Sequence, residues 1–334
     1  FYMLGAYLAF TLVSYFGGSD VFGFWGGVVL AALIVAALGA IVEIVILRRI
    51  YQAPELFQLL ATFGLVLMVQ DIALGIWGPE DKLGPRAPGF KSFVVLMGSR
   101  FPTYELFLIV VGPIMLGLLW FLFQKTRWGT LVRAATQDRE MVGALGVNQR
   151  LLFTSVFAFG AGLAALGGAL QLPREAVNLH MDLSMISEAF VVVVVGGLGS
   201  VTGAYLAAVL IGIIHAFGIL IFPKITLVLV FLVMAVVLVI KPYGLMGKRP
   251  VGSAHAHGPV EPLLLPASAN VKLIGLAALA VLLIAPFIVA DHWLLTLTEL
   301  SIFALFAASL HFMMGPGGMA SFGHAAYFGL GAYG

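Results

Sequence analysis

The chain has 334 residues, of which 62% are hydrophobic and only 10% are charged, with a formal net charge of +2 and no cysteine. About 25% of the residues of a soluble domain are charged, so this composition excludes a soluble globular protein and indicates a multi-span membrane protein. The small net charge argues against a nucleic-acid partner, and the lack of cysteine excludes disulfides and thiolate metal sites.

A helix that crosses the bilayer needs about 20 apolar residues. Apolar runs separated by Gly, Pro or charged residues predict an all-α polytopic transmembrane bundle with about ten spans or part-spans. Because the chain starts and stops inside such runs, we expect it to be a fragment of a longer protein. The predicted segments are 1–16, 22–47, 57–78, 104–124, 151–171, 186–196, 203–222, 225–240, 273–290 and 294–314, and a further run opens near residue 325.

Several polar residues lie within or beside these apolar segments. Such groups are costly in a membrane and commonly face a bundle interior or a cavity. For each one, bonding to a neighbouring helix is at least as good an explanation as contact with a substrate. Glu43 is a weaker candidate, because it lies five residues before Arg48 near the predicted membrane edge. The pathway candidates are Gln70, Asp71, Glu188 and His324.

Between Lys125 and Arg150 the chain becomes polar for one stretch and then returns to apolar sequence. Seven of the 32 charged residues (17 basic and 15 acidic) lie there. The apolar residues between Thr130 and Asn148 recur at roughly helical spacing, which predicts a short amphipathic helix suited to docking a protein. The alternative is a solvated helix beside lipid headgroups. The apolar residues of the segment are Leu131, Ala134, Ala135, Met141, Ala144 and Leu145.

Basic loops give the orientation, because they are enriched on the cytoplasmic side of a membrane. If Arg48 and Arg49 are cytoplasmic, alternation of the spans places 125–150 on the same side. This arrangement puts 11 Lys and Arg residues inside and six outside. The amphipathic helix is therefore predicted to be cytoplasmic.

A short apolar segment at 186–196 is followed by GGLGSVTG at 196–203. This pattern predicts a discontinuous helix, which a membrane tolerates where the backbone is buried in protein or lines a polar cavity. Gly196, Gly197 and Gly199 are pathway candidates, because glycines could expose backbone polar groups toward a zwitterionic substrate. The alternative role is close packing of helices by small residues.

From Lys241 to Asn270 the sequence is rich in Pro, Gly and small residues, which predicts a cytoplasmic linker between two membrane modules. We expect a first module at 1–240, the linker at 241–270 and the start of a second module at 271–334. The similarity of FYMLGAY at the start to YFGLGAY at 327–333 suggests that the modules are related. His255 and His257 in the linker supply too few ligands for a metal site, so neither a metal nor a cofactor is expected.

The stretch from Glu140 to Gly146, read as Glu-Met-Val-x-x-x-Gly, resembles the EAA loop of ABC importer permeases, which lies on a cytoplasmic coupling helix. ATFGLVLMVQD (61–71), the run 133–146 and EAFVVVVVGGLGSVTGA (188–204) together resemble permeases of branched-chain amino-acid ABC transporters. LHFMMGPGGMASFGHAAYFGLGAYG (310–334) resembles the start of the partner permease. The resemblance covers most of the chain and implies a fusion of two permeases. No proline follows Val156 and Ala158, where the family has a hydrophobic-x-Leu-Pro tail.

The resemblance implies that the polar helix transmits movement from a separate ATPase. Small residues would permit close seating in a groove of the ATPase, and charged residues would pair across a polar interface rim. The chain has no P-loop, since the nearest run, Gly244 to Lys248, has the wrong spacing, so we do not expect an enzyme. The residues assigned to ATPase coupling are Arg133, Asp138, Arg139, Glu140, Gly143 and Gly146.

The predicted function is the permease component of an ATP-driven importer of branched-chain or related amino acids in the bacterial inner membrane. Expected partners are cytoplasmic ABC ATPase subunits, a periplasmic or extracellular substrate-binding protein, membrane lipid and the amino-acid substrate. One alternative is a secondary amino-acid transporter with its own ion coupling, which suits Asp71 and Glu188 but leaves the amphipathic helix unexplained. A membrane scaffold or enzyme is disfavoured, because no nucleophile–base constellation is visible. Related permeases serve urea and amides as well as amino acids.

Overall fold

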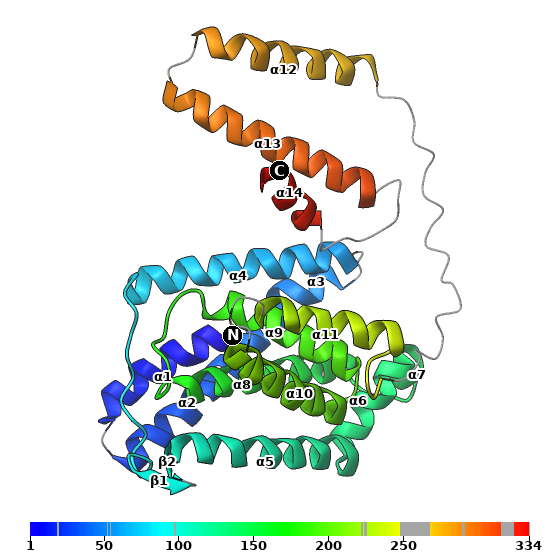
Figure 1. Cartoon of the computed structure of the whole chain (residues 1–334). Coiled ribbons are helices and arrows are strands. Elements are labelled where there is room, and N and C mark those ends of the chain that lie inside the picture. The colour runs from blue at the N-terminus through cyan, green and yellow to red at the C-terminus, as the bar shows by residue number, and fades with distance from the viewer. Residues whose placement is uncertain are drawn as a thin grey trace. The chain divides into compact units, whose positions relative to one another are not determined.

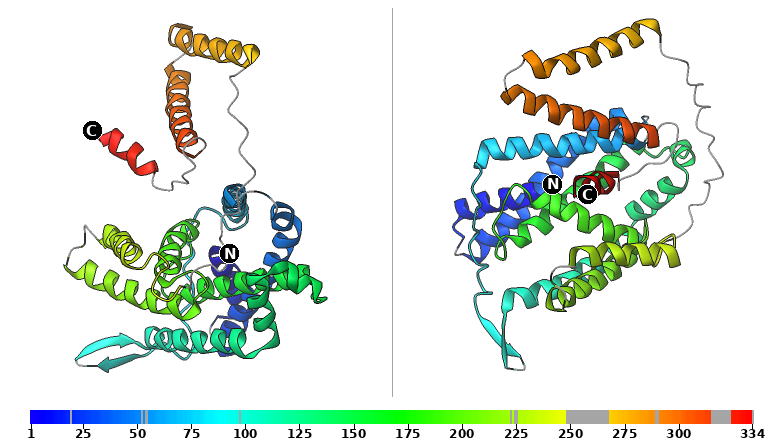
Figure 2. Two further views of the ribbon diagram at one scale, coloured as in Figure 1. Left: turned by 90° about the vertical axis from the view of Figure 1, so that its right-hand side faces the viewer. Right: turned by 45° about the horizontal axis from the view of Figure 1, so that its top comes forward.

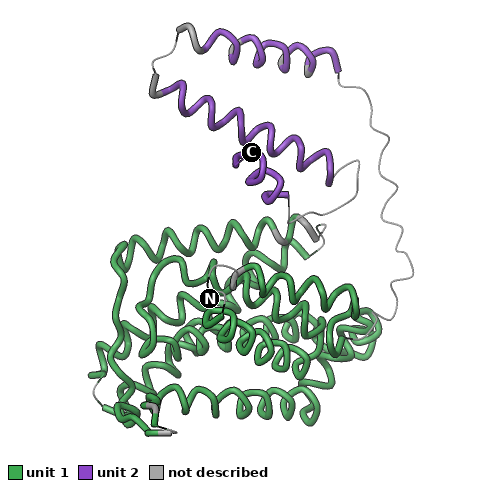
Figure 3. Tube along the Cα trace, in the orientation of Figure 1, with its two compact units in different colours: residues 1–253 green, residues 254–334 purple. Residues whose placement is uncertain are grey.

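The chain is described from a computed structural model. It divides into two compact units, Phe1–Ser253 and Ala254–Gly334, drawn in green and purple in Figure 3. Six helices in the described residues are long and apolar enough to cross a membrane. The predicted all-α polytopic bundle is thereby confirmed. The described residues are 1–18, 20–51, 53, 55–96, 98–221, 223, 226–247, 268–288, 291–314 and 324–333.

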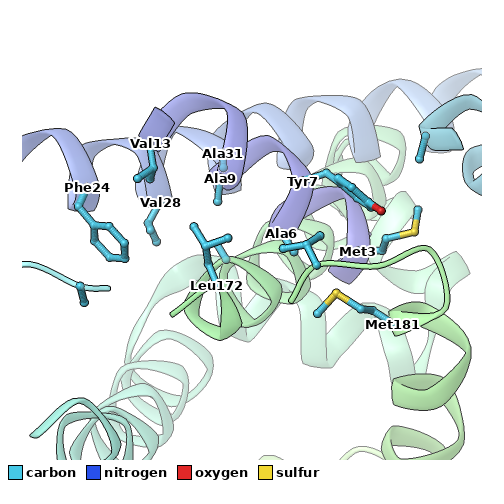
Figure 4. Close-up of a cluster of buried hydrophobic side chains, with 14 of the residues drawn as sticks. Met3, Ala6, Tyr7, Ala9, Val13, Phe24, Val28, Ala31, Leu172 and Met181 are labelled. Carbon is cyan, nitrogen blue, oxygen red and sulfur yellow. The ribbon is translucent and has the colours of Figure 1, made fainter. Parts of the chain in front are cut away.

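Three helices form the centre of the first unit: α1 (Tyr2–Phe16), α2 (Val21–Val42) and α8 (Gln149–Gln171). They approach closely because small residues face one another, and a Cβ on Gly5 would overlap the backbone of Ala165. Larger buried side chains complete the core. Figure 4 illustrates part of this core, which includes the fully buried Met3, Tyr7, Val13, Phe24, Val28 and Leu172.

The helix α2 does not end at Val42 but continues as a π-helical turn, η1 (Glu43–Leu47), and a short helix, α3 (Arg48–Ile50). The next helix, α4 (Glu55–Trp77), runs back along the unit, and its last residue stacks on Tyr7 at 5.0 Å between ring centroids. The indole nitrogen of Trp77 donates to Thr11 Oγ1 at 2.8 Å. These contacts fix the far end of α4 to α1.

A β-hairpin, which we did not predict from the sequence, precedes α5 (Thr103–Lys125). Its antiparallel strands are β1 (Phe93–Leu96) and β2 (Ser99–Pro102), and Gly98 lies in their connection at φ +82°. Strands of four residues give too short an alternating pattern to be recognised beside long apolar helices. The hairpin projects beyond the helix ends (Figure 2). The helices α6 (Arg127–Gln137) and α7 (Arg139–Ala144) follow α5 at its other end (Figure 1).

A second group of helices comprises α9 (Met181–Gly196), α10 (Val201–Ile221) and α11 (Thr226–Ile240). Their shared core contains Val191, Val195, Ala207, Ile211 and Val230. The helix α9 begins five residues earlier than the predicted segment at 186–196. Polar residues at its start hid this extra turn, since Asp182 is buried there and accepts the Met3 N–H at 2.9 Å.

The second unit contains α12 (Ala269–Ile288), α13 (Asp291–Met314) and α14 (His324–Tyr333). The first two correspond to the predicted segments 273–290 and 294–314. Within this unit the Phe306 ring packs on both His324 and Phe328, with centroids 5.3 and 5.2 Å apart. These contacts join α13 to α14.

Candidate functional site

The helix α6 is fixed to the membrane helices along one face. Thr126 caps it, because the Thr126 Oγ1 accepts the Gly129 N–H at 3.1 Å. The Trp128 indole donates to Ser155 Oγ on α8 at 2.8 Å. Gly129 has no room for a side chain, since a Cβ there would overlap the backbone of α5. The buried Ala135 completes a contact between α6 and the start of α8.

The predicted single amphipathic helix is two helices, because Asp138 ends one and begins the other. The Asp138 N–H donates to the Ala134 carbonyl at 3.0 Å, while Asp138 Oδ1 accepts the Met141 N–H at 2.9 Å. Aspartate is a favoured N-cap residue because its side chain satisfies a free backbone donor of the first turn. The Asp138 carboxylate therefore has a local structural role in addition to any contact with a partner.

Gly146 ends α7 in a Schellman motif. Its φ of +82° is in the left-handed region that favours glycine. The Gly146 N–H donates to Gly143 O at 3.0 Å, and the Val147 N–H donates to Val142 O at 3.4 Å. Val142 and Val147 also pack in the same cluster, which is the hydrophobic contact typical of this cap. The glycine predicted for coupling thus sets the end and direction of α7.

Arg139 and Gly143 hold α7 against α8. The Arg139 Nε donates to Gln149 Oε1 at 3.1 Å, and Gln149 Nε2 returns a hydrogen bond to Arg139 O at 2.6 Å. Any side chain on Gly143 would collide with the Gln149 amide. The Arg139 guanidinium also lies 4.5 Å from the centroid of the Phe153 ring and 6.0 Å from that of Tyr51. Although Arg139 is exposed, its partners in the described chain belong to its own unit.

The outward face of α7 carries apolar side chains that sequence reasoning had grouped with the inward ones. Met141 is 58% exposed and Leu145 is 75% exposed, whereas Val142 is buried. Glu140 and Ala144 are also exposed. The sequence predicts the helical spacing of these residues, but that spacing does not indicate the break at Asp138. We call the exposed side chains of Glu140, Met141, Ala144 and Leu145 the α7 surface.

The remaining coupling candidate, Arg133, is exposed on α6 and donates to the Gln124 side chain. The structure therefore brings the six predicted residues into one small region at the junction of α6, α7 and α8. Their roles differ: Asp138, Gly143 and Gly146 shape the region, and Arg139 anchors it. Glu140 and Arg133 leave charge at its surface. No described group of three or more His, Cys, Asp or Glu residues could hold a metal ion there or elsewhere.

The polar pathway candidates on α4 and α9 occupy different environments. Gln70 Nε2 donates to the Leu179 carbonyl at 3.1 Å, just before α9 begins. Asp71 and Glu188 are exposed on the chain surface, although both helices are predominantly apolar. Asp182 was not among the candidates, because it lies between the predicted segments 151–171 and 186–196. In the structure it is buried and tied to α1.

The glycines at 196–199 form a packed turn between α9 and α10. The Leu245 and Met246 N–H groups donate to Val195 O and Gly196 O at 2.8 and 3.1 Å. A Cβ on Gly197 would lie 2.6 Å from Gly247 Cα. Gly199 differs, since its φ is +81° but a Cβ there would meet nothing within 4 Å. The described contacts thus favour a packing role for Gly196 and Gly197, and a pathway role stays a prediction.

In the second unit, His324 lies 2.7 Å from Ser309 through its Nε2. Its Nδ1 is buried without a hydrogen-bond partner among the described residues. His255 and His257 lie outside the described residues. The structure therefore places His324 in a polar contact within its own unit, and its predicted pathway role stays a prediction.

Residues 1–238 match the family described as branched-chain amino acid transport system / permease component. The high-affinity branched-chain amino acid transport system permease protein BraD of Pseudomonas aeruginosa is 30% identical over 75% of this chain and 84% of its own length. LivH of Escherichia coli K12 is 26% identical over the same shares. LivM of the same organism is 26% identical over 63% of this chain and 54% of its own length. No solved structure matches the chain.

The matched region includes the central helices, both helices of the α6–α7 segment and the glycine turn after α9. It therefore contains the stretches 61–71, 133–146 and 188–204 that resemble branched-chain amino-acid permeases, whereas 310–334 lies outside it. The matches favour a transport permease over a secondary transporter with its own ion coupling. The chain belongs to the family of permease components of the branched-chain amino acid transport system.

Proposed function

We propose that the chain forms part of the membrane path of an ATP-driven importer of branched-chain or related amino acids. ATP is hydrolysed by a separate cytoplasmic ABC ATPase subunit, because the sequence has no P-loop. A periplasmic or extracellular binding protein delivers the substrate to the opposite side. The protein lies in the bacterial inner membrane, surrounded by lipid. The substrate class is inferred from that of the related permeases BraD and LivH.

The observation that carries the proposal is the α7 surface. The helix is fixed by an aspartate cap, a Schellman motif and the Arg139–Gln149 hydrogen bonds, and yet Met141 and Leu145 point away from the unit. Apolar side chains held rigidly on a polar segment suit the centre of a protein interface, with charged residues at its rim. A helix that only rested beside lipid headgroups would not need these fixed ends.

The exposed carboxylates of Asp71 and Glu188 support the proposed path. A charged group facing lipid is costly, and such groups commonly face a water-filled cavity or another helix. We infer that α4 and α9 present these side chains to the substrate path or to a second permease. Gln70 is the chain neighbour of Asp71, and we propose that it also lies near this path. Its amide nitrogen already donates a hydrogen bond to the Leu179 carbonyl.

We also propose that two permease modules, 1–240 and 271–334, are joined by the linker 241–270. The boundary between the compact units falls within that linker, of which residues 248–267 lie outside the described residues. The similar sequences FYMLGAY and YFGLGAY both belong to helices, α1 and α14. Two related modules would each contain such a helix, so the similarity of α1 and α14 supports the proposal.

Transport assays in proteoliposomes test the proposed energy source. We expect leucine uptake by the full chain, its ATPase subunits and its binding protein to require ATP hydrolysis. An ATPase variant that cannot hydrolyse ATP should abolish uptake, and valine or isoleucine should compete better than urea or amides. Uptake driven by a proton or sodium gradient without ATP would instead support the secondary-transporter alternative.

Cysteine labelling tests the proposed orientation, because the chain has no cysteine of its own. Thr136 on α6 and Ser92 beside β1 are both exposed. We expect Ser92→Cys to react with an impermeant maleimide in intact cells and Thr136→Cys to react only after the membrane is opened. Reaction of Thr136→Cys in intact cells would reverse the orientation and remove α7 from the cytoplasm.

A further inference from the structure

The carboxylate of Glu43 is fully buried where α2 passes into η1, and both of its oxygens are hydrogen-bonded. Arg48 Nη2 and Thr154 Oγ1 donate to Oε2 at 2.9 and 2.6 Å, and the Tyr51 hydroxyl donates to Oε1 at 3.3 Å. A buried charge is tolerated when it is paired and hydrogen-bonded in this way. Burial, followed by the nearby Glu43 carboxylate, raises the pKa of Tyr51, so this phenol stays a donor.

These contacts tie the end of α2 to the beginning of α8. Arg48 Nη2 also donates to Thr154 Oγ1 at 2.7 Å, so one guanidinium bridges the two helices. Further along, small residues keep the helices in close contact, since a Cβ on Gly39 would lie 2.6 Å from Ala161 Cβ. Interiors packed this closely transmit displacement rather than absorb it. The α2–α8 pair is therefore expected to move as one body.

The same group of residues reaches α7 through two aromatic rings. The Arg139 guanidinium of α7 lies over Phe153 and near Tyr51. Tyr51 bonds directly to Glu43, and Phe153 is the chain neighbour of Thr154. A displacement of α7 thus reaches the Glu43 carboxylate through two side-chain contacts.

Stability alone does not explain a charged group at this position. A buried ion pair contributes little compared with apolar side chains of the same volume, although removing one partner is strongly destabilising. Glu43 is also the first residue of a π-helical turn. Such turns are rare in proteins, and those that occur are often at functional sites. The directional hydrogen bonds of Glu43 select one arrangement of α2, α8 and the turn at Tyr51, which apolar packing would not.

We propose that Glu43, held by Arg48, Thr154 and Tyr51, is a positioning residue that makes α2 follow the movement that α7 passes to the start of α8. This inference rests on the proposed function, because the movement originates in an ATPase bound at α7. Glu43 itself is fully buried and lies apart from the α7 surface. Its loss should therefore separate ATP hydrolysis from transport without preventing ATPase recruitment.

The test uses Glu43→Gln and Thr154→Val in the full transporter reconstituted in proteoliposomes. Three quantities are measured: ATPase co-purification, the rate of hydrolysis, and leucine transported per ATP hydrolysed. We expect co-purification to stay within about twofold of the unmodified protein, while transport per ATP falls at least tenfold. Thr154→Ser, which keeps the hydroxyl, is the matched control and should transport normally.

A second measurement follows the movement directly. Spin labels at Phe22 on α2 and Leu220 on α10, both exposed, should change their separation when nucleotide binds, because the α2–α8 pair then moves relative to the second group of helices. Thr154→Val should abolish that change. If Glu43→Gln does not fold, because Arg48 loses its counter-ion, the inference is tested with Thr154→Val alone. A normal ratio of transport to hydrolysis in a folded variant overturns the inference. Absence of ATPase recruitment by the unmodified chain instead overturns the proposed function.

Discussion

Replacing Leu145 by glutamate is expected to abolish ATPase binding while the permease still folds and inserts. Leu145 is 75% exposed, so the substitution removes little packing within the unit. In the proposed interface the new carboxylate would lose water without gaining a partner. Charging a central apolar anchor should weaken binding by about 2 to 4 kcal/mol, or about 30- to 700-fold in Kd. Co-purification of the ATPase and substrate-stimulated hydrolysis in proteoliposomes measure the effect.

Thr136→Glu is the matched control for this variant. It places the same charge on the same peripheral segment, but on α6 rather than on the α7 surface, so recruitment should change by less than about threefold. Gly146→Trp is a less specific test, because φ at Gly146 is +82° and any side chain would strain the Schellman motif. If Leu145→Glu recruits and stimulates the ATPase normally, the assignment of α7 as the coupling helix is wrong.

The positions of most helices could be predicted from the sequence because long apolar runs leave little choice. The predicted segments 104–124 and 225–240 differ by one residue at most from each end of α5 (Thr103–Lys125) and α11 (Thr226–Ile240). Every backbone polar group within the bilayer must be satisfied, and a helix satisfies them within one segment. The length and composition of each run therefore determined its structure almost alone.

Local polar contacts were harder to predict, because each depends on a partner distant in the sequence or on a single cap. Asp138 divides the amphipathic segment through bonds to its neighbours, and Met141, in the first turn after this break, is exposed. From the sequence alone, Glu43 is a weak candidate for a functional role, because an ion pair with Arg48, five residues later, accounts for its charge. Its bond to Thr154 spans 111 residues of sequence, and no periodic pattern indicates such a contact.

Gly197→Ala is expected to prevent stable accumulation of the permease, whereas Gly199→Ala should be tolerated. Both glycines have positive φ, +97° and +81°, so alanine is strained at either position. The ψ of 128° at Gly197 also lies outside the left-handed helical region, so alanine is less favourable there. Only Gly197 lacks space, since its Cβ would lie 2.6 Å from Gly247 Cα and 2.7 Å from Tyr243 O. Membrane-fraction yield and thermal stability in detergent measure the difference.

Comparison of the two variants also separates the packing role of this turn from the pathway role. The carbonyls of Val195 and Gly196 already accept hydrogen bonds from Leu245 and Met246, which tie this turn to the segment after α11. We therefore expect Gly199→Ala to fold and to transport leucine within about twofold of the unmodified chain, given its open surroundings. Selective loss of transport in folded Gly199→Ala would place the turn in the substrate path. Normal folding of Gly197→Ala would contradict the packing that joins α9 to the segment after α11.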